Sequence, residues 1–355
     1  MIAYITHWHL GFQMLCSLAI SVISVAVLTI FVWQTIKDKR LAAASSVLVS
    51  FWFFCTVQWE NWLWGWQIEW FMCIAAVLVT LLLVNQFTLR RQSPYLLVLA
   101  GVSAIIATFS LGSGILVLPI VLAWLMIKNQ KRAYVISWAV FSVLPAAAYY
   151  LKYKRPADST PTVYLLHHPM QVIEYFFVYI GRPMSDNVGL AGAWGGAFFS
   201  LLMLTGFLAW NKKAHIEKFL PWVAILAFSM AADCITTISR VGFGLEQAVS
   251  SRYTAISLLF IISLLGITAT LISVCTKGHQ RKLAGLLVAV NIPLLILSNI
   301  QGLQGYRDRS AHMGVIKDCT HMPNPTKECL LVTIPGTGVD KKDLDYIKNK
   351  HWAGY

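Results

Sequence analysis

The sequence predicts an all-α, polytopic integral membrane protein with about ten transmembrane helices. Of its 355 residues, 57% are hydrophobic and only 12% are charged, and the mean hydropathy is +0.65. Soluble globular domains do not have this composition. The apolar runs are continuous and recur up to about residue 305, whereas a membrane β-barrel would show short segments of alternating polarity.

The individual spans follow from the apolar runs that lie between charged joints. A helix needs about 20 apolar residues to cross a bilayer. Merging the fourth and fifth runs around "FSLGSGILVLP" would give nine spans instead of ten. We expect a transmembrane domain over 1–305 and an extracytoplasmic tail over 306–355. The ten predicted spans are 10–34, 41–57, 69–87, 94–110, 113–127, 133–151, 188–210, 219–238, 253–275 and 283–304.

The distribution of basic residues orients these spans. The net charge is +13, and five short joints hold 14 of the 28 Lys and Arg residues. Basic loops stay in the cytoplasm, so both chain termini are predicted to be extracytoplasmic and acidic lipid headgroups are the expected partners of the joints. This pattern argues against nucleic-acid binding. The joints are Lys37–Arg40, Arg90–Arg91, Lys128–Arg132, Lys212–Lys218 and Lys277–Lys282.

One long outside loop, 152–187, contains a predicted interfacial helix. Apolar residues recur at helical spacing between Pro169 and Ile180, which is typical of an amphipathic helix lying in the membrane interface. The other outside loop of note, 239–252, contains two glycines and a short helical stretch.

The stretch "QWENWLWGWQIEW", residues 58–70, is the first candidate site. Five Trp residues at the end of a span are typical of an aromatic belt. Glu60 does not fit that explanation, because a carboxylate at the membrane edge requires water, a cation or a polar partner. We therefore expect Glu60 to face a cavity with Asn61 and Gln67. The indole of Trp64 suits the apolar face of a sugar.

The second candidate site is the stretch "DCITTISRVGFGLEQAVSSRY", residues 233–253. Arg240 and Arg252 bracket the outside loop with Glu246 between them, and Arg182 lies in the other outside loop. Guanidinium groups form paired hydrogen bonds with phosphate. An equally simple interpretation is that Arg240 pairs with Glu246 and Arg252 reaches toward the headgroups.

Cysteine and histidine spacing gives no metal or cofactor motif. No CxxC pair or Cys/His cluster is present, and nucleotide-binding patterns are absent, so no metal and no cofactor are expected. Cys319 and Cys329 lie ten residues apart in the polar tail. An extracytoplasmic tail would allow them to form a disulfide.

Four segments together resemble a group of bacterial polytopic membrane proteins that is similar to the GT-C class of membrane glycosyltransferases. They are "QWENWLWGWQ", "FSLGSGILVLP", "YFFVYIGRPM" and "RVGFGLEQAVSSRYTAIS". The resemblance implies a GT-C-like fold in the inner membrane. It also implies transfer of a sugar from a polyprenyl-phosphate carrier to a glycan acceptor of the cell envelope, on the periplasmic face.

The same resemblance assigns roles to the residues already selected. Glu60 matches the acidic residue of the first outside loop and would be the catalytic base. Arg240 and Arg252 match the basic residues that bind the lipid phosphate, with Tyr253 beside them. Two alternatives remain open: an O-antigen or exopolysaccharide polymerase that uses the same substrates, and a non-enzymatic envelope transporter or interaction protein.

Overall fold

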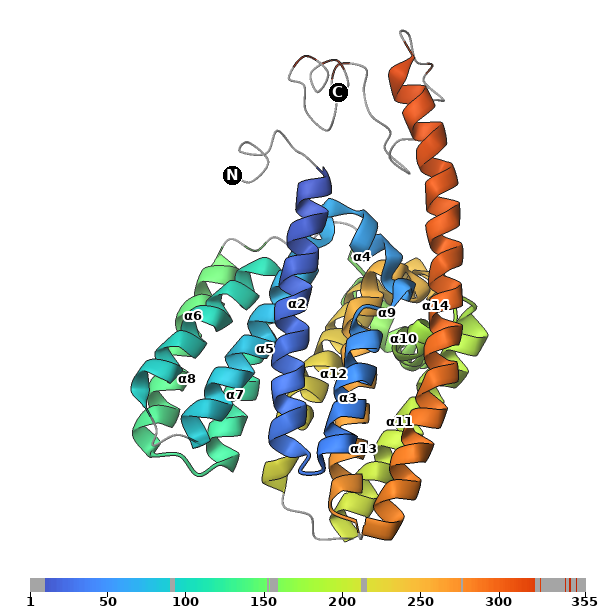
Figure 1. Cartoon of the computed structure of the whole chain (residues 1–355). Helices are drawn as coiled ribbons and strands as arrows, with labels where there is room; N and C mark the ends of the chain where they lie inside the picture. The colour runs from blue at the N-terminus through green and yellow to red at the C-terminus, as the bar shows by residue number, and fades with distance from the viewer. Residues whose placement is uncertain are drawn as a thin grey trace.

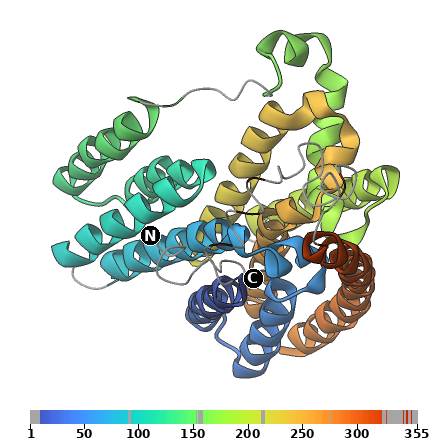
Figure 2. The same cartoon turned by 90° about the horizontal axis from the view of Figure 1, so that it is seen from above.

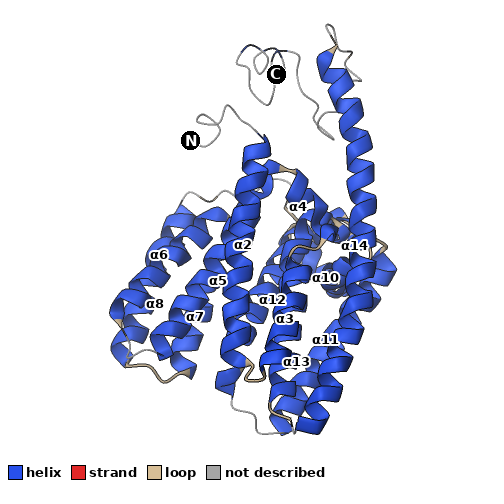
Figure 3. Cartoon of the chain, viewed as in Figure 1, coloured by secondary structure: helices blue, strands red, loops and turns tan. Residues whose placement is uncertain are grey.

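The computed structural model describes residues 10–89, 93–151, 153, 159–211, 216–275 and 277–322, and the single residues 326, 342, 345 and 349. Within these ranges the regular elements are helical and none is a strand (Figure 3). The α-helices are α2 (Leu10–Thr35), α3 (Lys39–Phe53), α4 (Trp59–Leu63), α5 (Ile68–Leu89), α6 (Pro94–Ser110), α7 (Val117–Ile127), α8 (Arg132–Leu151), α9 (Thr162–His167), α10 (Pro169–Gly181), α11 (Val188–Asn211), α12 (Leu220–Arg240), α13 (Thr254–Ser273) and α14 (Lys277–His321).

Eight helical segments of the described chain are long and apolar enough to cross a membrane. They correspond to eight of the ten predicted spans, so a helical architecture with several candidate membrane spans is confirmed for the described residues. The fourth and fifth predicted spans are the shorter apolar helices Pro94–Ser110 and Gly112–Ile127. The eight segments are Gly11–Thr35, Lys39–Leu63, Gly65–Leu89, Arg132–Leu151, Val188–Asn211, Leu220–Phe243, Ser251–Ser273 and Gly278–His312.

The glycine-rich stretch after α6 explains why α6 and α7 are short. The backbone becomes extended at Leu111 (φ −148°, ψ 140°) and then forms the 3₁₀ turn η3 (Gly112–Leu116). A Cβ at Gly114 would overlap the carbonyl oxygen of Ala107. Glycine therefore allows the chain to fold back against the end of α6, which separates the two helices.

Helix α13 occupies the centre of the bundle (Figure 1). It is apolar on all sides, and 94% of its membrane-length window is buried, as expected for a helix surrounded by other helices. Seen from above, α6 to α8 lie at one edge of the molecule, and α14 lies on the other side of α13 (Figure 2).

Polar side chains link the helices within the apolar bundle. Trp52 Nε1 of α3 donates to Asn291 Oδ1 of α14 at 2.9 Å, and Trp222 Nε1 of α12 donates to Thr35 Oγ1 of α2 at 3.0 Å. Such interhelical hydrogen bonds, together with close packing, stabilise bundles in lipid, where helices gain little from the hydrophobic effect.

Helix α14 is a single helix of 45 residues. It continues past the predicted domain boundary at residue 305 and ends at His321, so the first part of the predicted tail extends a membrane helix. Gly302 and Gly305 let it approach Thr56 and Trp59 closely, because a Cβ at either glycine would overlap those residues. This close approach brings the polar face of α14 next to α4.

The predicted disulfide of the tail concerns Cys319 and Cys329. Cys319 is buried and disulfide-bonded. Its predicted partner, Cys329, lies outside the described residues.

The orientation of the helices in the membrane is a prediction that reporter fusions can test directly. The α2–α3, α7–α8 and α13–α14 connections lie at one end of the bundle, and α4 lies at the other (Figure 1). We expect reporter fusions after Arg40, Arg132 and Lys282 to report a cytoplasmic location, and a fusion after Tyr306 to report an extracytoplasmic one. A cytoplasmic signal after Tyr306 would contradict the orientation derived from the basic joints.

Candidate functional site

The tryptophan-rich stretch forms a compact helical connection between α3 and α5. It consists of the 3₁₀ turn η1 (Thr56–Gln58), helix α4 and the 3₁₀ turn η2 (Gly65–Gln67). Trp62 stacks on Phe71 with ring centroids 4.6 Å apart. Trp64 and Trp66 are 45% and 62% exposed, which suits residues at the membrane interface.

The carboxylate of Glu60 binds the loop that precedes α13. Glu60 Oε2 accepts the backbone N–H of Arg252 at 2.7 Å and the hydroxyl of Ser250 at 3.3 Å. The backbone N–H of Glu60 donates to Ser251 Oγ at 3.3 Å. These bonds fix the position of a half-buried carboxylate at the start of α4, where the helix dipole also favours a negative charge.

Asn61 and Gln67 are buried and partly unsatisfied. Asn61 Nδ2 donates to the carbonyl oxygen of Arg252 at 3.1 Å, so it reinforces the same contact between α4 and the loop. Its Oδ1 atom and Gln67 Oε1 are buried without a hydrogen-bond partner in the described part of the chain. The side chain of Asn61 therefore supports the contact that holds Glu60.

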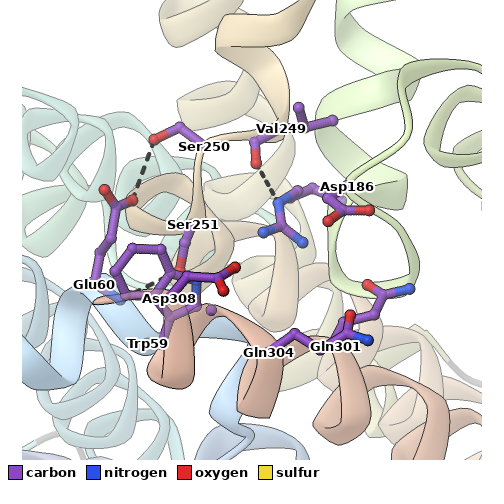
Figure 4. A pocket seen from close by; sticks show the side chains of 11 residues that line it. Trp59, Glu60, Asp186, Val249, Ser250, Ser251, Gln301, Gln304 and Asp308 are labelled. Carbon is purple, nitrogen blue, oxygen red and sulfur yellow. Dashed lines mark hydrogen bonds between the residues drawn. The ribbon is translucent and has the colours of Figure 1, made fainter. Parts of the chain in front are cut away.

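A cavity of about 520 Å³ lies beside Glu60. Figure 4 shows Glu60 on one side of it and Asp186 on the other. Three of its lining residues are acidic, one is basic, and amide and hydroxyl groups provide most of the remaining polar surface. It is lined by Trp59, Glu60, Arg182, Asp186, Val249, Ser250, Ser251, Gln301, Gln304, Gly305 and Asp308.

Arg182, in the 3₁₀ turn η4 (Arg182–Met184), is the basic residue of this cavity. It is only 6% exposed, and its Nε donates to the carbonyl oxygen of Val249. Burial lowers the pKa of the guanidinium, while Asp186 and Glu60 raise it. Its Nη1 is buried without a hydrogen-bond partner among the described residues, so the hydrogen-bonding capacity of the guanidinium is not fully used there.

The other predicted site residues lie outside this cavity. The guanidiniums of Arg240 and Arg252 lie over the rings of Phe243 and Tyr253, at 5.4 and 5.1 Å from the ring centroids. Glu246 is exposed. Neither arginine lines the cavity, although Val249, Ser250 and Ser251 of the loop that they bracket do.

Tyr253 lies in an aromatic cluster next to the guanidinium of Arg252. Tyr253 stacks on Tyr179 with ring centroids 5.6 Å apart, and Gln247 Nε2 donates to its hydroxyl oxygen at 3.2 Å. Burial raises the pKa of the nearby Tyr175 phenol, Tyr253 raises it further, and Arg240 and Arg252 lower it. Tyr175 is thus a neutral, buried phenol whose hydroxyl has no hydrogen-bond partner in the described chain.

Several residues of the cavity were not predicted from the sequence. Gln301, Gln304 and Asp308 follow one another at helical spacing in α14, on the side that faces α4. Their helical spacing across the end of the last apolar run was an available signal. Asp186, Ser250 and Ser251 had no comparable signal, because turns of the chain bring them to the cavity.

A buried carboxylate also lies within a membrane helix. Asp233 of α12 is fully buried, and neither of its carboxylate oxygens has a hydrogen-bond partner in the described chain. Among the residues that the structure describes, no group of three or more His, Cys, Asp or Glu side chains is arranged to hold a metal ion.

Comparison with protein-family models, with curated proteins and with solved structures gives no match.

Proposed function

We propose that the protein is a membrane glycosyltransferase of the inner membrane. It transfers a sugar from a polyprenyl-phosphate carrier to an envelope glycan on the periplasmic face. The observation that supports this best is the presence of Glu60 and Arg182 in one polar cavity of about 520 Å³ at the end of the bundle that carries α4.

The composition of the cavity suits a polyhydroxylated ligand. Carboxylates, the amides of Gln301 and Gln304, and two serine hydroxyls are the groups that bind sugar hydroxyls. Trp59 adds an aromatic surface for the apolar face of a sugar ring. With three acidic residues and one arginine, the lining suits a neutral glycan acceptor better than a pyrophosphate.

In this mechanism Glu60 and Arg182 act at opposite ends of one displacement. The carboxylate of Glu60 takes the proton of the acceptor hydroxyl as the oxygen forms a bond to the anomeric carbon. The bond from that carbon to the carrier phosphate breaks, and its electron pair leaves with the phosphate oxygen. The positive charge of the Arg182 guanidinium stabilises the negative charge that develops there.

The test is transfer by the purified protein in liposomes. Liposomes with a panel of radiolabelled polyprenyl-phosphate hexoses and isolated envelope glycan should release polyprenyl phosphate and label the glycan. Protein-free liposomes are the control. The proposal fails if no member of the panel is consumed above the control and if deletion of the gene leaves the envelope glycans unchanged.

Asp233 favours a second candidate function, ion-coupled transport. A carboxylate inside a membrane helix is costly and commonly marks a proton or ion pathway. If the protein is such a transporter, Asp233→Asn will abolish uptake of the transported solute that is driven by an ion or proton gradient across proteoliposomes. If it is a transferase in which Asp233 is structural, the same variant will transfer sugar at the normal rate.

A further inference from the structure

A second cavity lies at the other end of the bundle, away from Glu60. It has a volume of about 930 Å³ and lies between the start of α3 and the first turns of α14. The α2–α3 and α13–α14 connections meet at this end (Figure 1). Its lining combines a basic rim with an apolar wall, which neither the glycosyltransferase mechanism nor the helix packing explains.

The rim of this cavity carries a strong excess of positive charge. Lys37, Lys39, Arg40 and Arg281 line it, and Asp38 is its one acidic residue. The carboxylate of Asp38 already accepts the backbone N–H of Leu41 at 2.8 Å as the N-cap of α3. The cap does not neutralise the basic side chains, and the rim therefore attracts an anion.

One wall of the cavity is an apolar groove between α3 and α14, called the crease below, which is lined by both small and larger apolar residues. Ala44 of α3 faces Ala284, Gly285, Val288, Ala289 and Ile292 of α14. A Cβ added at Gly285 would meet no atom within 4 Å, so the crease has open space beside this residue. Both helices are long and apolar enough to cross a membrane, so in a bilayer the crease would face the acyl chains.

We propose that this cavity binds an anionic phospholipid of the leaflet that faces the basic joints. The lipid phosphate lies on Lys37, Lys39, Arg40 and Arg281, and one acyl chain lies along the crease beside Gly285. Basic pockets between transmembrane helices bind acidic headgroups in this way. A zwitterionic lipid lacks the net charge, and free phosphate lacks the chain, so neither satisfies both parts of the cavity.

Lipid selectivity of the unmodified protein is the first test. The protein, purified in detergent, is analysed by native mass spectrometry with cardiolipin, phosphatidylglycerol or phosphatidylcholine, each with and without inorganic phosphate. We expect retention of the two anionic lipids, loss of phosphatidylcholine, and no displacement by millimolar phosphate. Equal retention of phosphatidylcholine would overturn the proposal, and displacement by phosphate would indicate a site for the free anion.

Charge removal tests the rim with a matched control. Each basic side chain near an acidic membrane surface is worth about 1 kcal/mol, so Arg40→Gln with Arg281→Gln should weaken cardiolipin binding about 25-fold. Lys131→Gln with Arg132→Gln removes the same charge from the α7–α8 joint, outside this cavity, and should leave binding unchanged. An equal loss of cardiolipin binding in the two double variants would mean that the lipid is attracted non-specifically, and it would overturn the proposed site.

A steric variant tests the crease without changing charge. Gly285→Leu places a side chain in the open space and should reduce cardiolipin retention at least as much as the charge variant. Gly206→Leu is the control, because a Cβ at Gly206 in α11 also meets no atom within 4 Å. Normal cardiolipin retention by Gly285→Leu would refute the proposed path of the acyl chain.

Discussion

Replacement of Glu60 by Gln is expected to lower the turnover rate of sugar transfer by about 10²- to 10⁴-fold, the usual contribution of a general base. The amide has the shape of the carboxylate but cannot take a proton from the acceptor hydroxyl. Its oxygen can still accept the N–H of Arg252, which now lies 2.7 Å from the carboxylate. We therefore expect the loss to appear in kcat, with binding of the lipid-linked sugar retained.

The proper comparison is a Glu→Gln change at the same membrane face but away from the cavity. Glu174 is exposed on α10 and is not among the lining residues, so Glu174→Gln should transfer sugar at the normal rate. Both variants should elute as the unmodified protein does in size-exclusion chromatography. A normal kcat in Glu60→Gln would show that the carboxylate only attaches α4 to the loop 249–253, as its hydrogen bonds also permit.

The lengths and order of the helices could be predicted from the sequence because lipid imposes a strong local rule. A span must be continuous and apolar to satisfy its backbone hydrogen bonds, so the run that became α13 is visible in the sequence. The bounds of α6 and α7 were predicted too, because the spans 94–110 and 113–127 correspond to the apolar helices Pro94–Ser110 and Gly112–Ile127. The turn at Gly112–Leu116 depends on a close contact of Gly114 with α6, which the apolar runs do not encode.

The candidate site was only partly predictable, for a reason of geometry. Glu60 stood out because a carboxylate among indoles requires a polar partner, and the structure shows that partner to be the loop 249–253. Side-chain direction is not visible in a sequence. Arg240 and Arg252 occur in the expected loop, yet their guanidiniums lie over Phe243 and Tyr253, and the more distant Arg182 lines the cavity.

The residues that α14 adds to the cavity were also not predicted. The last apolar run ends near residue 304, which led to a predicted boundary between domain and tail at 305. The helix instead continues to His321, and its polar residues Gln301, Gln304 and Asp308 form one wall of the cavity. A decrease in hydropathy marks the end of the membrane, whereas the end of a helix depends on caps and contacts.

The helices that position Arg182 are packed through glycine. Arg182 directly follows α10, and α10 packs along α11 over much of its length. A Cβ at Gly195 of α11 would overlap the carbonyl oxygen of Phe177 in α10, and one at Gly181 would overlap that of Ala191. Small residues allow two membrane helices to approach each other this closely, so these glycines determine the position of η4 beside the cavity.

Gly195→Ala should therefore destabilise the protein by about 1–3 kcal/mol, the typical effect of overpacking, because a backbone carbonyl cannot move aside as a flexible side chain can. Gly196→Ala is the matched control at the next position. No atom lies within 4 Å of a Cβ there, and alanine in a helix interior is favoured over glycine by roughly 0.5–1 kcal/mol, so this variant should be as stable as the unmodified protein or more so. Thermal unfolding in one detergent, followed by size-exclusion chromatography, measures both. If Gly195→Ala melts at the same temperature as Gly196→Ala, close α10–α11 packing is not what holds Arg182 in place.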